Sequence, residues 1–338
     1  MAAPSNLRRR LLATVGGFGA LTIAVCLTAP LIGSTTIHLS RVFDRTIPFA
    51  DNVDAQVFFV ARLPRVLASA LVGSAFAIAG VVFQAFLRNP LASPDTLGVS
   101  SGATLGAVVV ITFHLDTAVL GISAVPVATF AGAAGALGIV YAMSIARRRG
   151  TSSTVLLLAG VALSAFLGAL NRFIQVIGDY TDTFRSIRWM MGSMDVGSYT
   201  DIVVALVPIA AACIAIGTLP RELDLVSIGA EAAESRGVDV RRAERVALVS
   251  ASLLTGSAVS LGGPIPFVGI IVPHIVRLIV GANHRLVLPA AALFGGAFLV
   301  ICDVIARTAF GAAGMPVGAI TAFLGGPFFL WLLFRRMR

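Results

Sequence analysis

The residues of this sequence with the greatest capacity for chemistry are charged, and many of them gather in one polar segment near the middle of the chain, residues 220–245. This segment contains six of the sixteen acidic residues, although charged residues make up only 12% of the sequence. Glu231 and Glu234 lie three positions apart, so a helix would place both carboxylates on one face. Asp224 or Asp239 can cap a neighbouring helix. The pattern indicates either an ionic contact surface for another molecule or an ordinary solvated loop.

Arginines at the edges of apolar stretches form a second group with chemical capacity. Arg62 and Arg65 flank Pro64 where a polar stretch meets an apolar one. The planar guanidinium group binds carboxylates through paired donors, which suits the docking of an acidic partner. The alternative is that these side chains extend to lipid headgroups. Arg307 could instead pair within the chain, because Asp303 lies four positions earlier on the same helix face and would compete with an external acidic partner.

The histidines and cysteines show no pattern typical of a metal or catalytic site. Cys26, Cys213 and Cys302 each stand alone in an apolar stretch, where free cysteine packs as a small hydrophobic residue. The four histidines are scattered, and no second ligand stands at helical spacing from His274. We expect no bound metal and no enzymatic activity, and we interpret His274, which follows Pro273, as a structural or gating residue in a helix break.

Hydrophobic residues make up 57% of the 338-residue chain, which leaves too few polar side chains to cover a water-soluble globule. The composition predicts an all-α integral membrane protein. A membrane-spanning helix needs about 20 apolar residues, and about ten such stretches are present. They are residues 11–32, 66–86, 97–113, 118–145, 155–177, 202–219, 246–261, 265–280, 287–305 and 317–334. Small residues at four-residue spacing, such as Ala128, Gly132 and Ala136, predict close helix packing in lipid.

All twenty-five basic residues are arginine. A phosphate-binding loop of the form GxxxxGK[ST] requires lysine and is therefore excluded, so any nucleotide hydrolysis that drives this protein must occur in another chain. With a cytoplasmic N-terminus, most of the arginines fall on the cytoplasmic side of the ten predicted spans. This bias places both termini in the cytoplasm. The net charge of +9 reflects that bias, and no nucleic-acid partner is expected.

Three composite motifs run through the chain. The first contains Arg62, Pro64, Arg65, Asn89, Pro90, Leu91, Ala92, Pro94, Gly98, Val99, Ser100 and Gly102. The second contains Gly263, Pro264, Ile265, Phe267, Gly269, Pro273, His274 and Arg277. The third contains Asp303, Arg307, Pro316, Gly318, Thr321, Gly325 and Pro327.

On these motifs the sequence resembles the membrane permeases of bacterial ABC importers for iron-siderophores, haem and vitamin B12, the FecCD/BtuC-type family. The resemblance covers nearly the whole chain. It implies a BtuC-like type II permease fold in one transmembrane domain, residues 1–338, in the cytoplasmic (inner) membrane. Residues 220–245 would be the cytoplasmic coupling segment. The implied substrate is a large metal chelate, with an iron(III)-siderophore favoured over vitamin B12 or haem. An ion-coupled secondary transporter is the alternative from another class.

The resemblance also implies partners. Two ATP-binding cassette ATPase subunits would hold ATP and Mg²⁺, so that no cofactor is expected in this chain. A second permease subunit, either a copy of this chain or a close paralogue, would complete the pathway within membrane lipid. A solute-binding protein would dock on the outer face.

The resemblance assigns expected roles to three sets of residues. ATPase coupling is expected of Gly229, Glu231, Glu234, Arg236 and Gly237, with Gly237 ending the acidic helix. Docking of the binding protein is expected of Arg62, Arg65 and Arg307. A cytoplasmic gate is expected where Ser153 and Thr154 meet the loop that contains Asn89, Pro90 and Pro94.

Overall fold

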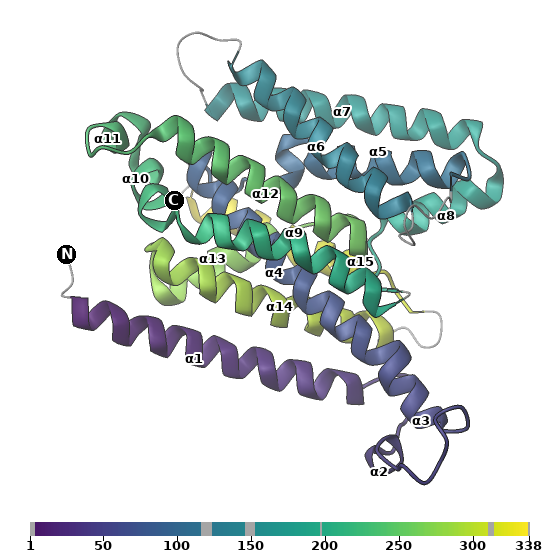
Figure 1. Ribbon diagram of the computed structural model, residues 1–338. Coiled ribbons are helices and arrows are strands. Elements are labelled where there is room, and N and C mark those ends of the chain that lie inside the picture. The colour runs from purple at the N-terminus through teal and green to yellow at the C-terminus, as the bar shows by residue number, and fades with distance from the viewer. Residues whose placement is uncertain (1–3, 116–123, 146–152, 197, 310–313, 337–338) are drawn as a thin grey trace.

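The computed structural model describes residues 4–115, 124–145, 153–196, 198–309 and 314–336, and these residues are helical with no strand (Figure 1). Among them, six helices are long and apolar enough to cross a membrane, and four shorter helices are also apolar. Each of the ten predicted spans coincides with one of these helices. They are α1 (Pro4–Thr28), α4 (Leu63–Phe86), α5 (Val99–Thr112), α6 (Ala124–Ile145), α7 (Ser153–Ile177), α9 (Tyr199–Gly217), α12 (Val240–Gly262), α13 (Val268–Val280), α14 (His284–Thr308) and α15 (Val317–Arg336).

Short elements lie at the two ends of the bundle. They are η1 (Ala29–Leu31), α2 (Leu39–Val42), α3 (Val53–Gln56), η2 (Val57–Arg62), η3 (Pro94–Leu97), α8 (Tyr180–Met190), α10 (Pro220–Ile228) and α11 (Ala230–Glu234). In Figure 1, α10 and α11 lie at the left with the start of α1, whereas α2, α3 and α8 lie at the right. The arginine bias identifies the left end as cytoplasmic and the right end as the outer face.

The helix that carries the first arginine pair is irregular. The elements α3, η2 and α4 form one helical segment, Val53–Phe86, which passes through a π-helical stretch immediately before α4. Pro64 has no backbone N–H and cannot donate the usual bond to the preceding turn. Arg62 ends the π-helical stretch and Arg65 lies in the first turn of α4, so the arginine pair lies at the irregular turn.

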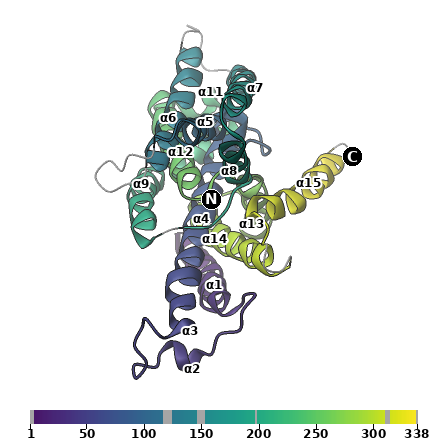
Figure 2. The same ribbon diagram turned by 90° about the vertical axis from the view of Figure 1, so that its right-hand side faces the viewer.

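Helix α4 is the centre of the fold. It packs against α12, α13 and α14, and Figure 2 shows it between α12 and α14. Side chains on several of its faces are fully buried, including Val72, Val81 and Phe83. A helix that is apolar and buried around its circumference is typical of the middle of a membrane bundle.

Glycines set the distance between α4 and its neighbours. A Cβ atom on Gly73 would lie 2.2 Å from the carbonyl oxygen of Gly295 in α14, and one on Gly80 would lie 2.0 Å from that of Gly269 in α13. The backbones therefore touch directly, as small residues permit in lipid. Gly132 makes the same kind of contact with α5, which confirms close packing at one of the positions predicted from the sequence.

Replacement of Gly73 by valine is expected to destabilise the fold by about 1–3 kcal/mol, because the added atoms must push α4 away from α14. Gly135→Val is the matched control, since nothing lies within 4 Å of a Cβ atom at that position of α6. Thermal unfolding of both variants in detergent would measure the difference. Equal unfolding midpoints would contradict the packing argument.

Candidate functional site

The outer face contains a pocket of about 520 Å³ rich in arginine. Its charged lining residues are Arg62, Arg65, Arg188, Arg307 and Asp195. They come from four parts of the chain: the η2–α4 segment, α8, the segment after α8, and α14. Four guanidinium groups face one carboxylate in the lining, and a second carboxylate, Asp303, lies behind Arg65 and Arg307, so the positive charges are in excess and favour anionic groups.

Arg65 is held by two carboxylates with different environments. Its Nε lies 2.9 Å from Oδ1 and 3.0 Å from Oδ2 of Asp303, whose side chain is 1% exposed. Its Nη1 lies 2.6 Å from Oδ1 of Asp195, whose side chain is 58% exposed. Arg307 is the second cation beside Asp303, at 3.7 Å, as the spacing of the two residues predicts. Asp303 is therefore a buried carboxylate that holds two of the arginines lining the pocket.

The other two predicted docking arginines are largely occupied within the fold. Arg62 is 5% exposed, and its guanidinium donates to the carbonyl oxygens of Pro30, Leu31 and Thr35. Arg307 donates to the carbonyl oxygen of Ala29. These contacts fasten the end of α1 to the pocket. Pattern reasoning missed them because backbone carbonyls are present at every residue and leave no trace in the sequence.

The segment that carries Asp195 also joins distant elements. The Ser193 hydroxyl donates to Oδ2 of Asp195 at 2.9 Å, and the Ser193 backbone N–H donates to the carbonyl oxygen of Gly262 at 2.9 Å. A Cβ atom on Gly318 would lie 2.2 Å from the carbonyl oxygen of Met191, so the start of α15 also touches this segment. The rim of the pocket is thus attached to α12 and α15. Asp195 and Arg188 belong to none of the three composite motifs, so no role was expected of them from the sequence.

Removal of the two carboxylates is expected to have unequal effects. Asp303→Ala should destabilise the protein by about 3–5 kcal/mol, because it leaves a partly buried arginine without its buried partner. Asp195→Ala should cost less than about 1 kcal/mol, because that ion pair faces solvent. Thermal unfolding in detergent measures both variants, and a larger loss for Asp195→Ala would contradict this assignment.

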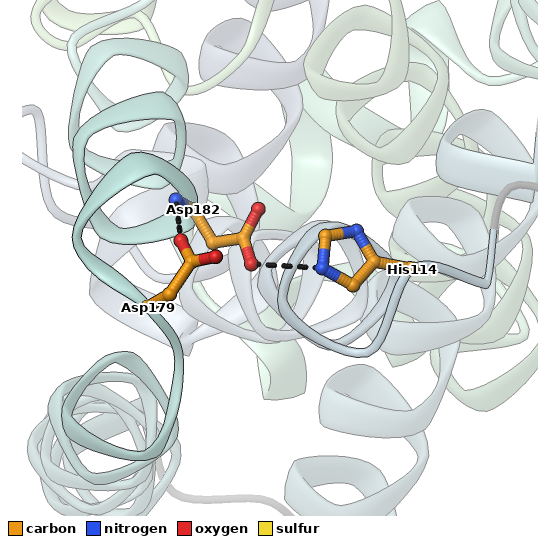
Figure 3. Close-up of side chains that lie close together, drawn as sticks. All are labelled: His114, Asp179 and Asp182. Atoms are coloured by element: carbon orange, nitrogen blue, oxygen red, sulfur yellow. Dashed lines mark hydrogen bonds and ion pairs between the residues drawn. The ribbon is translucent and has the colours of Figure 1, made fainter.

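A second cluster at the outer face joins the end of α5 to the start of α8 (Figure 3). The Nε2 atom of His114 lies 3.0 Å from Oδ2 of Asp182, and Oδ1 of Asp179 accepts the Asp182 backbone N–H at 2.8 Å as an N-cap. The donor atoms of the three side chains lie within 4.8 Å of one another, a spacing that a metal ion can bridge. The N-cap and the His114–Asp182 contact account for the cluster as a helix junction. His114 had no assigned partner because Asp182 is distant in sequence.

At the cytoplasmic end, the predicted acidic helix is α11. Glu231 and Glu234 are both exposed, while Ala233 between them is buried. Gly237 has a φ of +78° and its N–H donates to the carbonyl oxygen of Glu234 at 2.9 Å, so it ends the helix as expected. Arg236 is also exposed. The segment presents charge outward.

Residues 220–245 are joined to the bundle through Asp224, which makes two contacts with His284. Oδ1 of Asp224 accepts the backbone N–H of His284 at 2.9 Å and lies 2.6 Å from its Nδ1, so Asp224 binds the first residue of α14. Asp224 thus caps a neighbouring helix as predicted, whereas Asp239 is the N-cap residue of α12 itself and accepts the backbone N–H of Arg242 at 3.0 Å. The side chain of Arg88, which follows α4, lies near the segment as well: a Cβ atom added to Gly229 would be 4.0 Å from its Nη1 atom.

The loop between α4 and α5 contains the predicted gate residues. Oδ1 of Asn89 accepts the N–H of Leu91 at 3.0 Å and shapes the turn that contains Pro90, and Pro94 starts η3. Helix α7 meets this loop at Gly160 and at Ser164, whose hydroxyl donates to the carbonyl oxygen of Asp95 at 3.2 Å.

Ser153 is the first residue of α7, and the side chains of Ser153 and Thr154 lie outside the described part of the chain. The contacts that the described residues show between α7 and the gate loop are those of Gly160 and Ser164, and the gate role expected of Ser153 and Thr154 stays a prediction.

One expectation was wrong in detail. His274 does not lie in a helix break, because α13 runs through Pro273 without interruption. The His274 ring packs edge-on against Phe328 of α15, with ring centroids 5.6 Å apart. Helix α13 begins at Val268 rather than near Ile265, because Phe267 at its N-cap adopts a left-handed backbone conformation that cannot be part of a right-handed helix.

Known proteins are similar to this chain in sequence and in the arrangement of their helices. The sequence matches the FecCD transport family over residues 21–335. The cobalamin import system permease protein BtuC of Halobacterium salinarum is 45% identical over 80% of this chain and 72% of its own length. The hemin transport system permease protein HmuU of Yersinia pestis is 38% identical over 93% of this chain and 94% of its own length.

A solved structure of a metal-chelate type ABC transporter in an inward-facing conformation has a TM-score of 0.81 with this fold. It is 29% identical, and the match covers 95% of this chain and 98% of that one. The fold and the family together define a polytopic membrane permease of an ABC importer, a class whose ATPase is a separate chain. This chain belongs to the FecCD transport family.

Proposed function

We propose that this chain carries a large metal chelate across the cytoplasmic membrane, with an iron(III)-siderophore as the substrate. The observation that carries the proposal is that α14 has a binding surface at each end. Its first residue, His284, is bound to the exposed charged segment through Asp224. Near its last turn, Asp303 holds Arg65 in the outer pocket. A single helix of 25 residues, about 37 Å long, connects the two faces.

The cytoplasmic end of this connection is the coupling segment, residues 220–245. Two ATPase subunits dock there, one on this chain and one on a second permease subunit, and they alone bind ATP and Mg²⁺. Glu231, Glu234 and Arg236 supply exposed charge, and Ile228, which is 68% exposed, supplies an apolar contact. Gly229 and Gly237 bound the helix between them. When the ATPases close, displacement of α10 moves α14 through the Asp224 contact.

At the outer end, a solute-binding protein docks on the arginine pocket. Complementary charge orients such docking more than it adds affinity. Arg65 is the best placed of the three proposed docking residues, because its second partner, Asp195, is exposed and exchangeable. Arg62 and Arg307 add to the positive electrostatic potential of the pocket, while their hydrogen bonds hold the segment that follows α1.

Inside the membrane, the pathway is closed on the cytoplasmic side by the loop with Asn89, Pro90 and Pro94 and by the first turn of α7 with Ser153 and Thr154. Small hydroxyl groups pack tightly without strong binding to a passing solute. The contact of Gly160 and Ser164 with η3 supports a closure between these two elements.

Cobalamin is the second candidate substrate, favoured by the 45% identity to a cobalamin permease. A cell that lacks its own permeases for these solutes, supplied with this chain and its ATPase and binding protein, would be tested for uptake of radiolabelled ferric siderophore, cobalamin and haem. We expect saturable uptake of ferric siderophore. Uptake of cobalamin or haem alone would replace the proposed substrate, and ATP-independent uptake would exclude the ABC mechanism.

Reversal of the acidic face of α11 should uncouple the transporter. Glu231→Arg with Glu234→Arg is expected to abolish substrate-stimulated ATP hydrolysis by the assembled transporter and to lower uptake at least tenfold, while the fold is retained, because both side chains project outward. Asp51→Arg, an exposed charge reversal at the outer face, is the control for added positive charge. Normal uptake by the double variant would remove the role assigned to α11.

A further inference from the structure

A groove on the side of the bundle, between α6 and α12, lies outside the proposed gate and the outer pocket, and it shares only Arg245, the last residue of the coupling segment, with the proposed transport machinery. It has a volume of about 300 Å³, and its lining is apolar except for Arg245 and Ser252. Phe130 and Val249 are partly open to the surroundings, with exposures of 38% and 60%. The groove therefore opens outward from the bundle, where a membrane protein meets lipid.

The direction of the groove follows from the two helices that form it. Helix α12 leaves the cytoplasmic segment at Val240, so Arg245 lies near the cytoplasmic surface and Leu253 lies deeper in the membrane. Eight residues of helix separate them, a depth of about 12 Å. One leaflet of hydrocarbon is about 15 Å thick. The groove thus extends through most of the cytoplasmic leaflet, and an acyl chain matches its length and polarity.

The cytoplasmic end of the groove is positively charged. Arg245 is exposed, and its Nε donates to the carbonyl oxygen of Arg241 at 3.4 Å. Arg241 and Arg242 are exposed within the preceding turn, so three arginines stand near two acids, Asp239 and Glu244. Guanidinium groups bind phosphate through paired, charge-assisted hydrogen bonds. Basic residues beside a groove between spans on the cytoplasmic side are typical of sites for anionic lipid headgroups.

We propose that the α6–α12 groove binds an anionic phospholipid of the cytoplasmic leaflet, with one acyl chain in the groove and the phosphate on Arg245. The charge at the mouth and the apolar lining match the two halves of a lipid molecule. The proposal does not depend on the transported substrate, because no residue of the groove lines the outer pocket or belongs to the gate.

Native mass spectrometry of the purified full-length chain tests the proposal directly. The protein would be titrated in detergent with phosphatidylglycerol and with phosphatidylcholine of the same acyl chains. We expect phosphatidylglycerol to bind about fivefold more tightly, the factor expected from one favourable charge near the surface. Arg245→Gln should remove this preference, whereas Arg285→Gln, at another exposed cytoplasmic arginine, should keep it.

A second pair of variants tests the acyl-chain site without a change of charge. Nothing lies within 4 Å of a Cβ atom on Gly138 or Gly135, so leucine can be placed at either position of α6. Gly138 lines the groove and Gly135 does not. Gly138→Leu should reduce lipid retention at least fivefold, and Gly135→Leu should leave it unchanged.

Three outcomes would overturn the proposal. One is equal affinity of the unmodified chain for the two lipids. Another is unchanged lipid retention in Gly138→Leu. The third is a shift of Gly138→Leu from dimer to monomer with no loss of lipid, which would show that a second copy of the chain covers the groove.

Discussion

The structure depends on direct backbone contact between α4 and the helices around it. In lipid, apolar side chains gain nothing by leaving the solvent for one another, so helices associate through close packing and polar contacts. Gly73 against Gly295 and Gly80 against Gly269 provide that packing on two neighbours of α4. Because these contacts fix α4 relative to α13 and α14, they also fix the two ends of the molecule at which charged residues lie.

The charged contacts specify which helix ends meet. Asp303 lies almost fully buried beneath Arg65, and a buried carboxylate of this kind contributes less to net stability than to the choice of arrangement. At the opposite end of α14, Asp224 holds the first residue of the same helix. One long element is therefore attached at each end to a charged surface, and these are the two surfaces proposed as docking sites for partners. A motion imposed at one surface has a physical route to the other.

Local features of this protein were readable from the sequence because they depend on neighbours along the chain. The ten apolar stretches became helices, Gly237 ended the acidic helix, and Asp303 and Arg307 came together at a spacing of one helical turn. The contacts between distant residues were not readable. Arg65 and Asp195 are 130 positions apart, and His284 and Asp224 are 60 apart, so each pairing requires knowledge of which helix ends adjoin. The position of Arg62 at the outer face was predicted from the sequence, but its partners were not, because they are backbone carbonyl oxygens.

The sequence by itself determined the membrane class, the helical spans, the cytoplasmic placement of both ends and the family, because composition, charge bias and long motifs are properties of the chain alone. The tertiary structure decided how the charged groups are used. It divided the arginines of the outer pocket between fastening α1 and facing an exchangeable carboxylate, and it joined the charged segment to α14. It also opened a groove beside Arg245. The physical reason is that burial and pairing of a charge depend on which helices pack together, and that packing brings together residues far apart in the chain.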